Sequence, residues 1–341
     1  MEYQLHPELR IAIETGNPSY RKYFENEYKR VSGYESSANP ILVTAKIVSR
    51  EPKVASADRI HRKLTFKKIF HYEYWIDGLE TDNVTIYFKN IFWGSLYSKT
   101  VTLFLQAQIL EPVLYYKLLS RNVLFMHAAG AEADGKGYLF PAYGGTGKTT
   151  LTLGLMGEGL GVLGDDLLLV EADNLKVYPY LRPLHIFTYN VRTLRGAAVP
   201  MEFSFKVKVK DILRIILETL TRQEFLISTR IHAEQLYPNF RKGNPAKVEK
   251  IVFLKKEGEH EKHAVSNENV RDLATIILNS EDLNDSLYDN ILDASQKAAA
   301  VAKELAVIEK LLTNAGQLQL VNTRLFDFRD LSGFKHDILG A

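Results

Sequence analysis

The chain has 341 residues, of which 46% are hydrophobic and 25% charged, and it carries a formal net charge of +2 at pH 7. These fractions are typical of a globular protein in water, with enough residues for two ordinary domains. The nearly balanced charge gives no electrostatic case for nucleic-acid binding, and the absence of cysteine excludes disulfides, cysteine-ligated zinc and thiol nucleophiles.

Two further absences set expectations about location. No stretch of about 18 consecutive apolar residues occurs, which is the length that a membrane span needs. Residues 1–18 mix charged with apolar residues and lack the basic, apolar and small-residue order of a signal peptide. We therefore expect a cytoplasmic protein with neither a membrane nor a nucleic acid among its partners.

The first part of the chain, 1–120, contains short segments in which apolar and polar residues alternate. The clearest of these segments are 41–48, 68–76 and 83–89. Their β-branched and aromatic content, with Gly and Asp between them, predicts antiparallel strands. A helix is expected across 103–119, where Pro112 must start or kink it. We predict a mixed β/α N-terminal domain that recognises an acceptor or partner.

Basic residues outnumber acidic ones between Lys46 and Lys68. Such a cluster fits a docking face for an acidic protein, a peptide carboxylate or a nucleic acid. It is more often the solvated face of a sheet, and we favour that interpretation.

The second part, 121–260, alternates predicted strands and helices around a glycine-rich loop. A strand across 124–133 and a second across 138–142 precede the loop, and a helix follows it. A short apolar run then leads to Asp165 and Asp166, and the segment 172–174 turns the chain back as a hairpin. The order strand, loop, helix, strand places a phosphate site at the carboxyl ends of strands.

Further along, 211–220 has the pattern of a helix and 250–256 that of a buried strand with charged ends. The third part, 261–341, is expected to be a mainly helical extension. Its clearest feature is an apolar stripe with alternating spacings of three and four, made of Ile291, Ala294, Ala298, Val301, Leu305, Ile308 and Leu312. This stripe predicts a helix that packs on its own domain and stops near Gly316.

The glycine-rich loop, AYGGTGKT over 142–149, has the phosphate-binding (Walker A) form A/G-x-x-x-x-G-K-S/T. Glycine lacks a Cβ, so the loop backbone can take positive φ and approach phosphate oxygens closely. We predict that Lys148 places a charge on the β- and γ-phosphates and that the Thr149 hydroxyl binds Mg²⁺. The predicted nucleotide-binding set is Gly144, Gly145, Thr146, Gly147, Lys148, Thr149 and Thr150.

Two adjacent carboxylates, Asp165 and Asp166, stand where a neighbouring strand ends, which is where a second Mg²⁺ ligand is expected. One carboxylate can hold the metal while the other accepts a proton from an attacking hydroxyl. In the simpler alternative, one of them serves the metal and the other only caps a turn, because neighbouring residues of a strand face opposite sides. Any one of Arg182, Arg192 and Arg195 could clamp a phosphate bidentately.

The segment HAAGAEADGKGYLFPAYGGTGKTTLTLGLMGEGLGVLGDD, from His127 to Asp166, resembles the catalytic core of the HPr kinase/phosphorylase family. More widely, it resembles the phosphoenolpyruvate-carboxykinase-like P-loop proteins. The resemblance implies that Asp165 is the acid/base, that Asp166 lies by the metal and that His127 lies near the transferred phosphate. Residues 183–245 do not reproduce the substrate-binding signature of the family, so the acceptor stays open.

Together these patterns predict an α/β protein with a P-loop kinase-like core of HPr kinase type, a β-rich N-terminal domain and a helical C-terminal extension. The expected activity transfers the γ-phosphate of ATP, with Mg²⁺ as cofactor, to an acceptor hydroxyl such as a serine of a protein or peptide. Homo-oligomers are compatible with this prediction. Two alternatives are a nucleotide-responsive binding or regulatory protein without transfer, and a carboxykinase-like enzyme acting on a small carboxylic acid.

Overall fold

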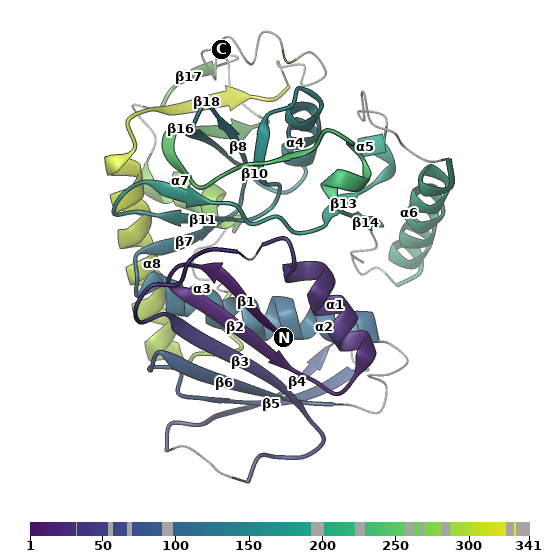
Figure 1. Ribbon diagram of the computed structural model, residues 1–341, viewed down its shortest axis with the longest axis vertical. Coiled ribbons are helices and arrows are strands. Elements are labelled where there is room, and N and C mark those ends of the chain that lie inside the picture. The colour runs from purple at the N-terminus through teal and green to yellow at the C-terminus, as the bar shows by residue number, and fades with distance from the viewer. Residues whose placement is uncertain are drawn as a thin grey trace. The chain divides into compact units, whose positions relative to one another are not determined.

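The structure is a computed structural model that describes residues 1–31, 33–53, 57–66, 70–90, 98–191, 201–221, 229–256, 262–265, 269–280, 287–324 and 331 (Figure 1). It has a mixed α/β fold with mixed sheets, as the sequence predicts. The chain forms two compact units, one of Met1–Leu124 with Ser280–Lys310 and one of Phe125–Asn279 with Leu311–Ala341. The expected division into three parts differs from this, because residues 261–341 are shared between the two units.

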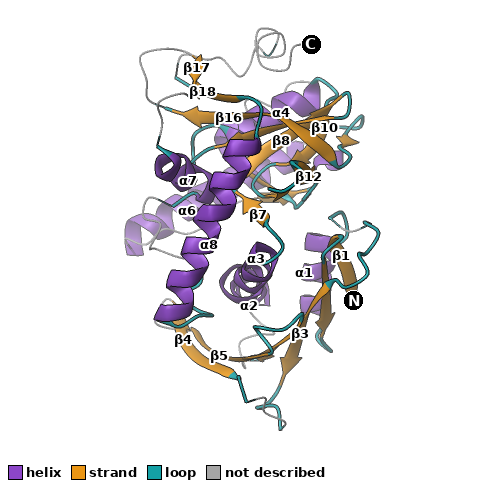
Figure 2. Ribbon diagram, turned by 90° about the vertical axis from the view of Figure 1, so that its left-hand side faces the viewer, coloured by secondary structure: helices purple, strands orange, loops and turns teal. Residues whose placement is uncertain are grey.

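The first unit contains a sheet of six strands in the order β1-β2-β3-β6-β5-β4. The strands are β1 (Glu2–His6), β2 (Leu9–Glu14), β3 (Ile41–Val48), β4 (Ile60–Phe66), β5 (Phe70–Asp77) and β6 (Asn83–Lys89). Alternate residues of β3 and β6 are buried, as their period-two sequence predicts. Helices α1 (Pro18–Tyr28) and α2 (Ser98–Leu105) cover one face of the sheet, where Phe104 of α2 stacks on Tyr72 of β5 (Figure 2).

The prediction of antiparallel pairing is wrong for β3, which pairs in parallel with both β2 and β6. Helix α1 lies between β2 and β3 in the chain and carries it back to the end of the sheet where β2 begins. Such a crossover is what two parallel strands need, whereas a tight turn joins only antiparallel ones. Only β1–β2, β4–β5 and β5–β6 pair antiparallel in this sheet, as far as the described residues show.

The helix expected across 103–119 is present in three consecutive pieces. These are α2, a π-helical turn η2 (Gln106–Leu110) and α3 (Glu111–Leu119). Pro112 lies in the first turn of α3, directly after the π-helical turn. The proline therefore lies where one piece of a continuous helical path begins, in line with the expectation that it starts or kinks the helix.

The second unit is built on a ten-stranded mixed sheet with the main order β15-β10-β8-β9-β16-β12-β11-β7, and with β18 paired to both β16 and β17. The strands are β7 (Val123–Met126), β8 (Ala128–Ala133), β9 (Lys136–Pro141), β10 (Gly161–Gly164), β11 (Leu168–Glu171), β12 (Lys176–Tyr178), β15 (Arg241–Lys242), β16 (Ala246–Lys255), β17 (Lys262–Ala264) and β18 (Leu318–Asn322). A separate pair is formed by β13 (Leu184–Ile186) and β14 (Thr229–Ile231).

The helices of the second unit are α4 (Lys148–Gly157), α5 (Thr188–Val191), α6 (Met201–Thr221) and α7 (Val270–Leu278), with a 3-10 turn at Ala233–Gln235. Leu151 and Leu155 of α4 are buried in one cluster with Phe140 of β9 and Val252 of β16. The strand that precedes the glycine loop and its neighbour β16 therefore share a core with the helix that follows the loop. Figure 2 shows α4 against the sheet near β8 and β10.

The single strand expected across 124–133 is interrupted at His127, which separates β7 from β8. The His127 N–H donates to the carbonyl of Ile277 in α7 at 2.8 Å, so this backbone group is paired with a helix instead of a strand. The predicted hairpin over 172–174 is confirmed by antiparallel pairing of β11 with β12.

Helix α8 (Ala294–Asn314) confirms the long C-terminal helix but not its whole buried stripe. Ala294 and Ala298 are exposed, whereas Ala300 and Glu304 are buried. The buried face of the first half instead includes Glu304, whose carboxylate accepts a hydrogen bond from the buried Tyr288 hydroxyl at 3.3 Å. None of the helices in the described part of the chain combines the length and apolar composition that a membrane crossing requires.

Candidate functional site

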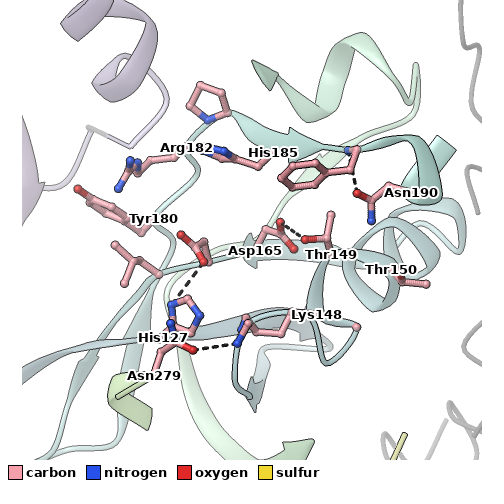
Figure 3. Close-up of a pocket in the computed structure, with 17 residues that line it drawn as sticks. His127, Lys148, Thr149, Thr150, Asp165, Tyr180, Arg182, His185, Asn190 and Asn279 are labelled. Carbon is pink, nitrogen blue, oxygen red and sulfur yellow. Dashed lines mark hydrogen bonds and ion pairs between the residues drawn. The ribbon is translucent and has the colours of Figure 1, made fainter. Parts of the chain in front are cut away.

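Three segments of the second unit supply most of the residues that line a cavity of about 710 Å³ (Figure 3). They are the glycine loop between β9 and α4, the segment after β10, and the stretch from Tyr180 through β13 to α5. The volume is within the range of small-molecule sites. The structure thus brings together both aspartates, His127 and the predicted loop residues except Thr146, which is buried and does not line the cavity.

The loop backbone depends on glycine at two places. Gly145 has φ of 73° and Gly147 has φ of 119°, a conformation that a Cβ disfavours. Gly147 is also the N-cap of α4, which begins at Lys148 as predicted. Gly144, in contrast, has no positive φ. The positive end of the α4 dipole therefore points at the cavity. The loop before the helix takes a backbone conformation that favours glycine.

The Lys148 side chain is held close to the loop. Its Nζ donates to the carbonyl oxygen of Ala142 at 2.5 Å and to that of Tyr143 at 3.2 Å. Burial lowers the pKa of Lys148 to about 8, although Asp166 and Asp165 act in the opposite direction. The amine therefore remains a cation at pH 7. Phosphate oxygens would be better acceptors for it than neutral carbonyls, because hydrogen bonds between ionised groups are stronger.

Asp165 is linked to the loop through the predicted magnesium ligand. The Thr149 hydroxyl donates to Oδ2 of Asp165 at 2.9 Å. Burial raises the pKa of Asp165 to about 6, against the opposing effect of the Thr152 and Thr149 hydroxyls beside it. Its other oxygen, Oδ1, is buried and has no hydrogen-bond partner among the described residues. A buried acceptor of this kind is suited to a cation or a proton.

Asp166 and His127 face one another in the cavity, with Nδ1 of His127 at 3.4 Å from Oδ1 of Asp166. The side chain of Asp166 is 61% exposed. Burial lowers the pKa of His127 to about 4, although the Asp166 charge raises it. The imidazole is therefore neutral at pH 7. Its contact with Asp166 is an interaction between a neutral, polar ring and a charged carboxylate, not an ion pair. With Nδ1–H directed at the carboxylate, Nε2 is an acceptor that no described residue satisfies.

Two cationic side chains and two imidazoles surround Asp166. Partial loss of water raises the pKa of Asp166. The groups around it lower the pKa by more in total, so that the net shift is downward. These groups are His127, Arg182, Lys148 and His185. Figure 3 shows Arg182 and His185 on the side of Asp165 away from Lys148. Asp166 is thus an ionised carboxylate whose charge Arg182 and Lys148 stabilise.

Arg182 is the one of the three candidate arginines that the structure assigns to the cavity lining. Arg192 and Arg195 lie outside the described residues. His185 lines the cavity as well, although no metal-ligand spacing singled it out in the sequence. It lies in β13, which follows the aspartates and their hairpin in the chain.

Helix α7 supplies a residue that the sequence did not indicate. Asn279, at the end of α7, lines the cavity, and its Oδ1 accepts a hydrogen bond from the Gly144 N–H at 2.9 Å. The Tyr143 hydroxyl bonds to Thr275 of the same helix at 2.6 Å. No local pattern links these positions to the loop, because they are far away in the chain.

The residues present fit a magnesium nucleotide. Among the described residues, no group of three or more His, Asp or Glu could hold a metal by itself. Mg²⁺ is commonly bound by one or two protein ligands together with substrate phosphates and water. Thr149, Asp165 and Asp166 could supply such ligands beside a loop shaped for phosphate.

Comparison with protein-family models and with curated proteins finds no match for this chain. The resemblance to the HPr kinase/phosphorylase family rests on the segment from His127 to Asp166.

Proposed function

We propose that this protein is an ATP- and Mg²⁺-dependent phosphotransferase with a P-loop kinase-like core of HPr kinase type. The acceptor is a hydroxyl group, for example a serine of a protein or peptide. One observation supports this above the others. The hydroxyl of Thr149, in the loop, bonds to Asp165, and Asp166 lies next to it in the same cavity. A phosphate cradle with two carboxylates beside it matches the requirements of phosphoryl transfer.

In the proposed reaction the loop backbone and Lys148 bind the β- and γ-phosphates. The acceptor oxygen attacks the γ-phosphorus, a new P–O bond forms, and the bond to the β–γ bridging oxygen breaks to release ADP. A carboxylate takes the proton of the acceptor hydroxyl. When bound, Mg²⁺ neutralises charge on the phosphates, and Thr149 with one aspartate would hold it. The chain itself contributes position and charge.

The division of labour between the aspartates has two versions. The resemblance makes Asp165 the proton acceptor and Asp166 the metal-side residue. The raised pKa of Asp165 supports that version, since a base works best with a pKa near the working pH. The hydrogen bond from Thr149 supports the reverse version, in which Asp165 is on the metal side and the exposed Asp166 faces the acceptor.

We propose the first version, and magnesium titration separates the two. If Asp165 is the base, Asp165→Asn binds ATP at the same Mg²⁺ concentration as the unaltered protein but transfers no phosphate. If Asp165 is on the metal side, this variant needs more Mg²⁺ to bind ATP, and Asp166→Asn becomes the variant with normal binding and no transfer.

His127 and Arg182 have supporting roles in this proposal. The Nδ1–H of His127 orients the carboxylate of Asp166. Arg182 lowers the pKa of Asp166 through its charge, and a guanidinium at this place also suits the oxygens of a transferred phosphoryl group. The acceptor hydroxyl would then enter between Arg182 and the aspartates.

The proposal is tested by incubating the protein with γ-labelled ATP and a total cell lysate. Labelled proteins and peptides are then identified by mass spectrometry. We expect a labelled product with the unaltered protein and none with Lys148→Ala. Lys136→Ala is the matched control, because Lys136 begins β9, which ends at the loop, and pairs with Glu249 at 3.2 Å. Hydrolysis of ATP without any labelled product would overturn the proposal in favour of a nucleotide-responsive regulatory protein.

A further inference from the structure

Asn279 is held beside the glycine loop by its own backbone and by its helix. It has φ of 53°, a left-handed conformation that asparagine tolerates better than most residues, and its N–H caps α7 by donating to the carbonyls of Ile276 and Thr275. Its side chain then accepts the Gly144 N–H at 2.9 Å. The side-chain amide is therefore positioned both by the backbone of Asn279, which is bonded to α7, and by the bond from Oδ1 to Gly144.

The same helix turn makes two further contacts with the site. Thr275 Oγ1 accepts the Tyr143 hydroxyl at 2.6 Å and donates its own proton to the carbonyl of Asp272 at 2.7 Å. The Ile277 carbonyl accepts the His127 N–H at 2.8 Å. The end of α7 thus contacts both the first half of the loop and the residue that faces Asp166. Figure 3 shows Asn279 next to His127, on the Lys148 side of the cavity.

The hydrogen bond to Gly144 determines which way the amide points. A backbone N–H can only donate, so the atom of Asn279 that meets it is the carbonyl oxygen. The NH₂ group is then at the other end of the planar amide. Asn279 is exposed and lines the cavity, and no described residue accepts a hydrogen bond from its Nδ2. The cavity therefore has an additional amide donor beside Lys148.

We propose that Nδ2 of Asn279 donates to a γ-phosphoryl oxygen and so makes the site prefer a nucleoside triphosphate over a diphosphate. This inference rests on the proposed nucleotide site. The loop N–H groups next to α4 surround the β-phosphate, and transfer requires the γ-phosphate to lie toward the aspartates and His127. Asn279 is on that side, since its helix bonds to His127 as well as to Gly144. Removal of the donor should therefore weaken triphosphate binding and spare diphosphate binding.

Asn279→Asp separates this role from a merely structural one. Aspartate keeps an oxygen for the Gly144 N–H and also tolerates positive φ, but it replaces the NH₂ donor with an anionic oxygen. Thr275→Val is the matched control, because it removes the other anchor of the loop without changing the cavity. Asn279→Gly is a second variant, which suits φ of 53° and removes the whole side chain.

The measurement is the dissociation constant of MgATP and of MgADP, obtained by titration calorimetry for each variant. We expect Asn279→Asp to weaken MgATP binding about tenfold or more, because a charged hydrogen bond is lost and replaced by repulsion, and to change MgADP binding by less than about twofold. Asn279→Gly should also weaken MgATP binding more than MgADP binding. Thr275→Val should change both constants by the same factor.

Equal weakening of MgATP and MgADP by Asn279→Asp or by Asn279→Gly would show that Asn279 only shapes the loop, and unchanged binding would show that it has neither role. Either result overturns this inference while the unaltered protein still binds MgATP and transfers phosphate. If the unaltered protein binds MgATP with the expected selectivity but labels no acceptor, the proposed phosphotransferase activity fails and the role of Asn279 stands. If it binds no MgATP, both fail.

Discussion

The substitution Asp165→Asn should stabilise the protein while it abolishes transfer. Burial raises the pKa of Asp165 to about 6 from 3.8, so keeping this carboxylate ionised in the folded state costs free energy. Asparagine has the same shape and still offers an oxygen to the Thr149 hydroxyl at the position of Oδ2. It cannot accept a proton from an acceptor hydroxyl, so transfer is lost.

The size of the gain follows from the shift in pKa. A raised folded pKa means that the unfolded chain releases its proton first, so the stability of the unaltered protein falls as the pH rises from 3.8 to about 6. Linkage between these values gives a cost of about 3 kcal/mol at pH 8 and less than about 1 kcal/mol at pH 4. The advantage of Asp165→Asn should therefore grow with pH over this interval and level off above it.

The assay is denaturant unfolding of both proteins at several values between pH 4 and pH 8, with nucleotide absent. Asp166→Asn is the matched control, because the folded pKa of Asp166 is lowered, and its ionisation therefore favours the folded state. This control should be no more stable than the unaltered protein at pH 8. If Asp165→Asn gives the same free energy of unfolding as the unaltered protein at every pH, Asp165 is not the destabilised carboxylate inferred above.

Two other predictions concern the loop and the first unit. Gly147→Ala should destabilise the second unit by about 1–2 kcal/mol and weaken MgATP binding, because φ of 119° disfavours a Cβ. Denaturant unfolding and calorimetry measure the two effects. Gly316→Ala is the control, because a Cβ there would meet nothing within 4 Å. Equal stability of the two variants would contradict this. Burial raises the pKa of Glu304 to about 7 from 4.5, so stability should fall between these pH values. Glu304→Gln should remove that slope and be more stable by up to about 3 kcal/mol at pH 8 in denaturant unfolding, and a slope that persists in this variant would assign it to another group.

The sequence alone was sufficient for the local geometry of the loop. The glycines, Lys148 and Thr149 are consecutive or nearly so, and a helix that starts directly after a glycine at positive φ places them by short-range geometry. The hairpin after Asp166 was likewise predictable, because its turn and both strands are adjacent in the chain. Strand period also predicted which residues of β3 and β6 are buried.

The tertiary structure decided everything that depends on segments far apart in the chain. Alternation identifies a strand but not the direction of its neighbour, so β3 was expected to pair antiparallel and is parallel on both sides. The stripe of α8 indicated an apolar face, yet the buried face includes Glu304, whose carboxylate accepts a hydrogen bond from Tyr288 outside the helix.

The site divides in the same way. Lys148, Thr149 and the two aspartates are recognisable because their spacing carries the chemistry. Asn279 is not, because its role arises only when the end of α7 is placed against Gly144. The neutral state of His127 and the raised pKa of Asp165 also arise in the folded chain, since both come from removal of water by residues that no local pattern brings together. Short-range spacing thus determined which groups are available, and long-range packing determined what each of them faces.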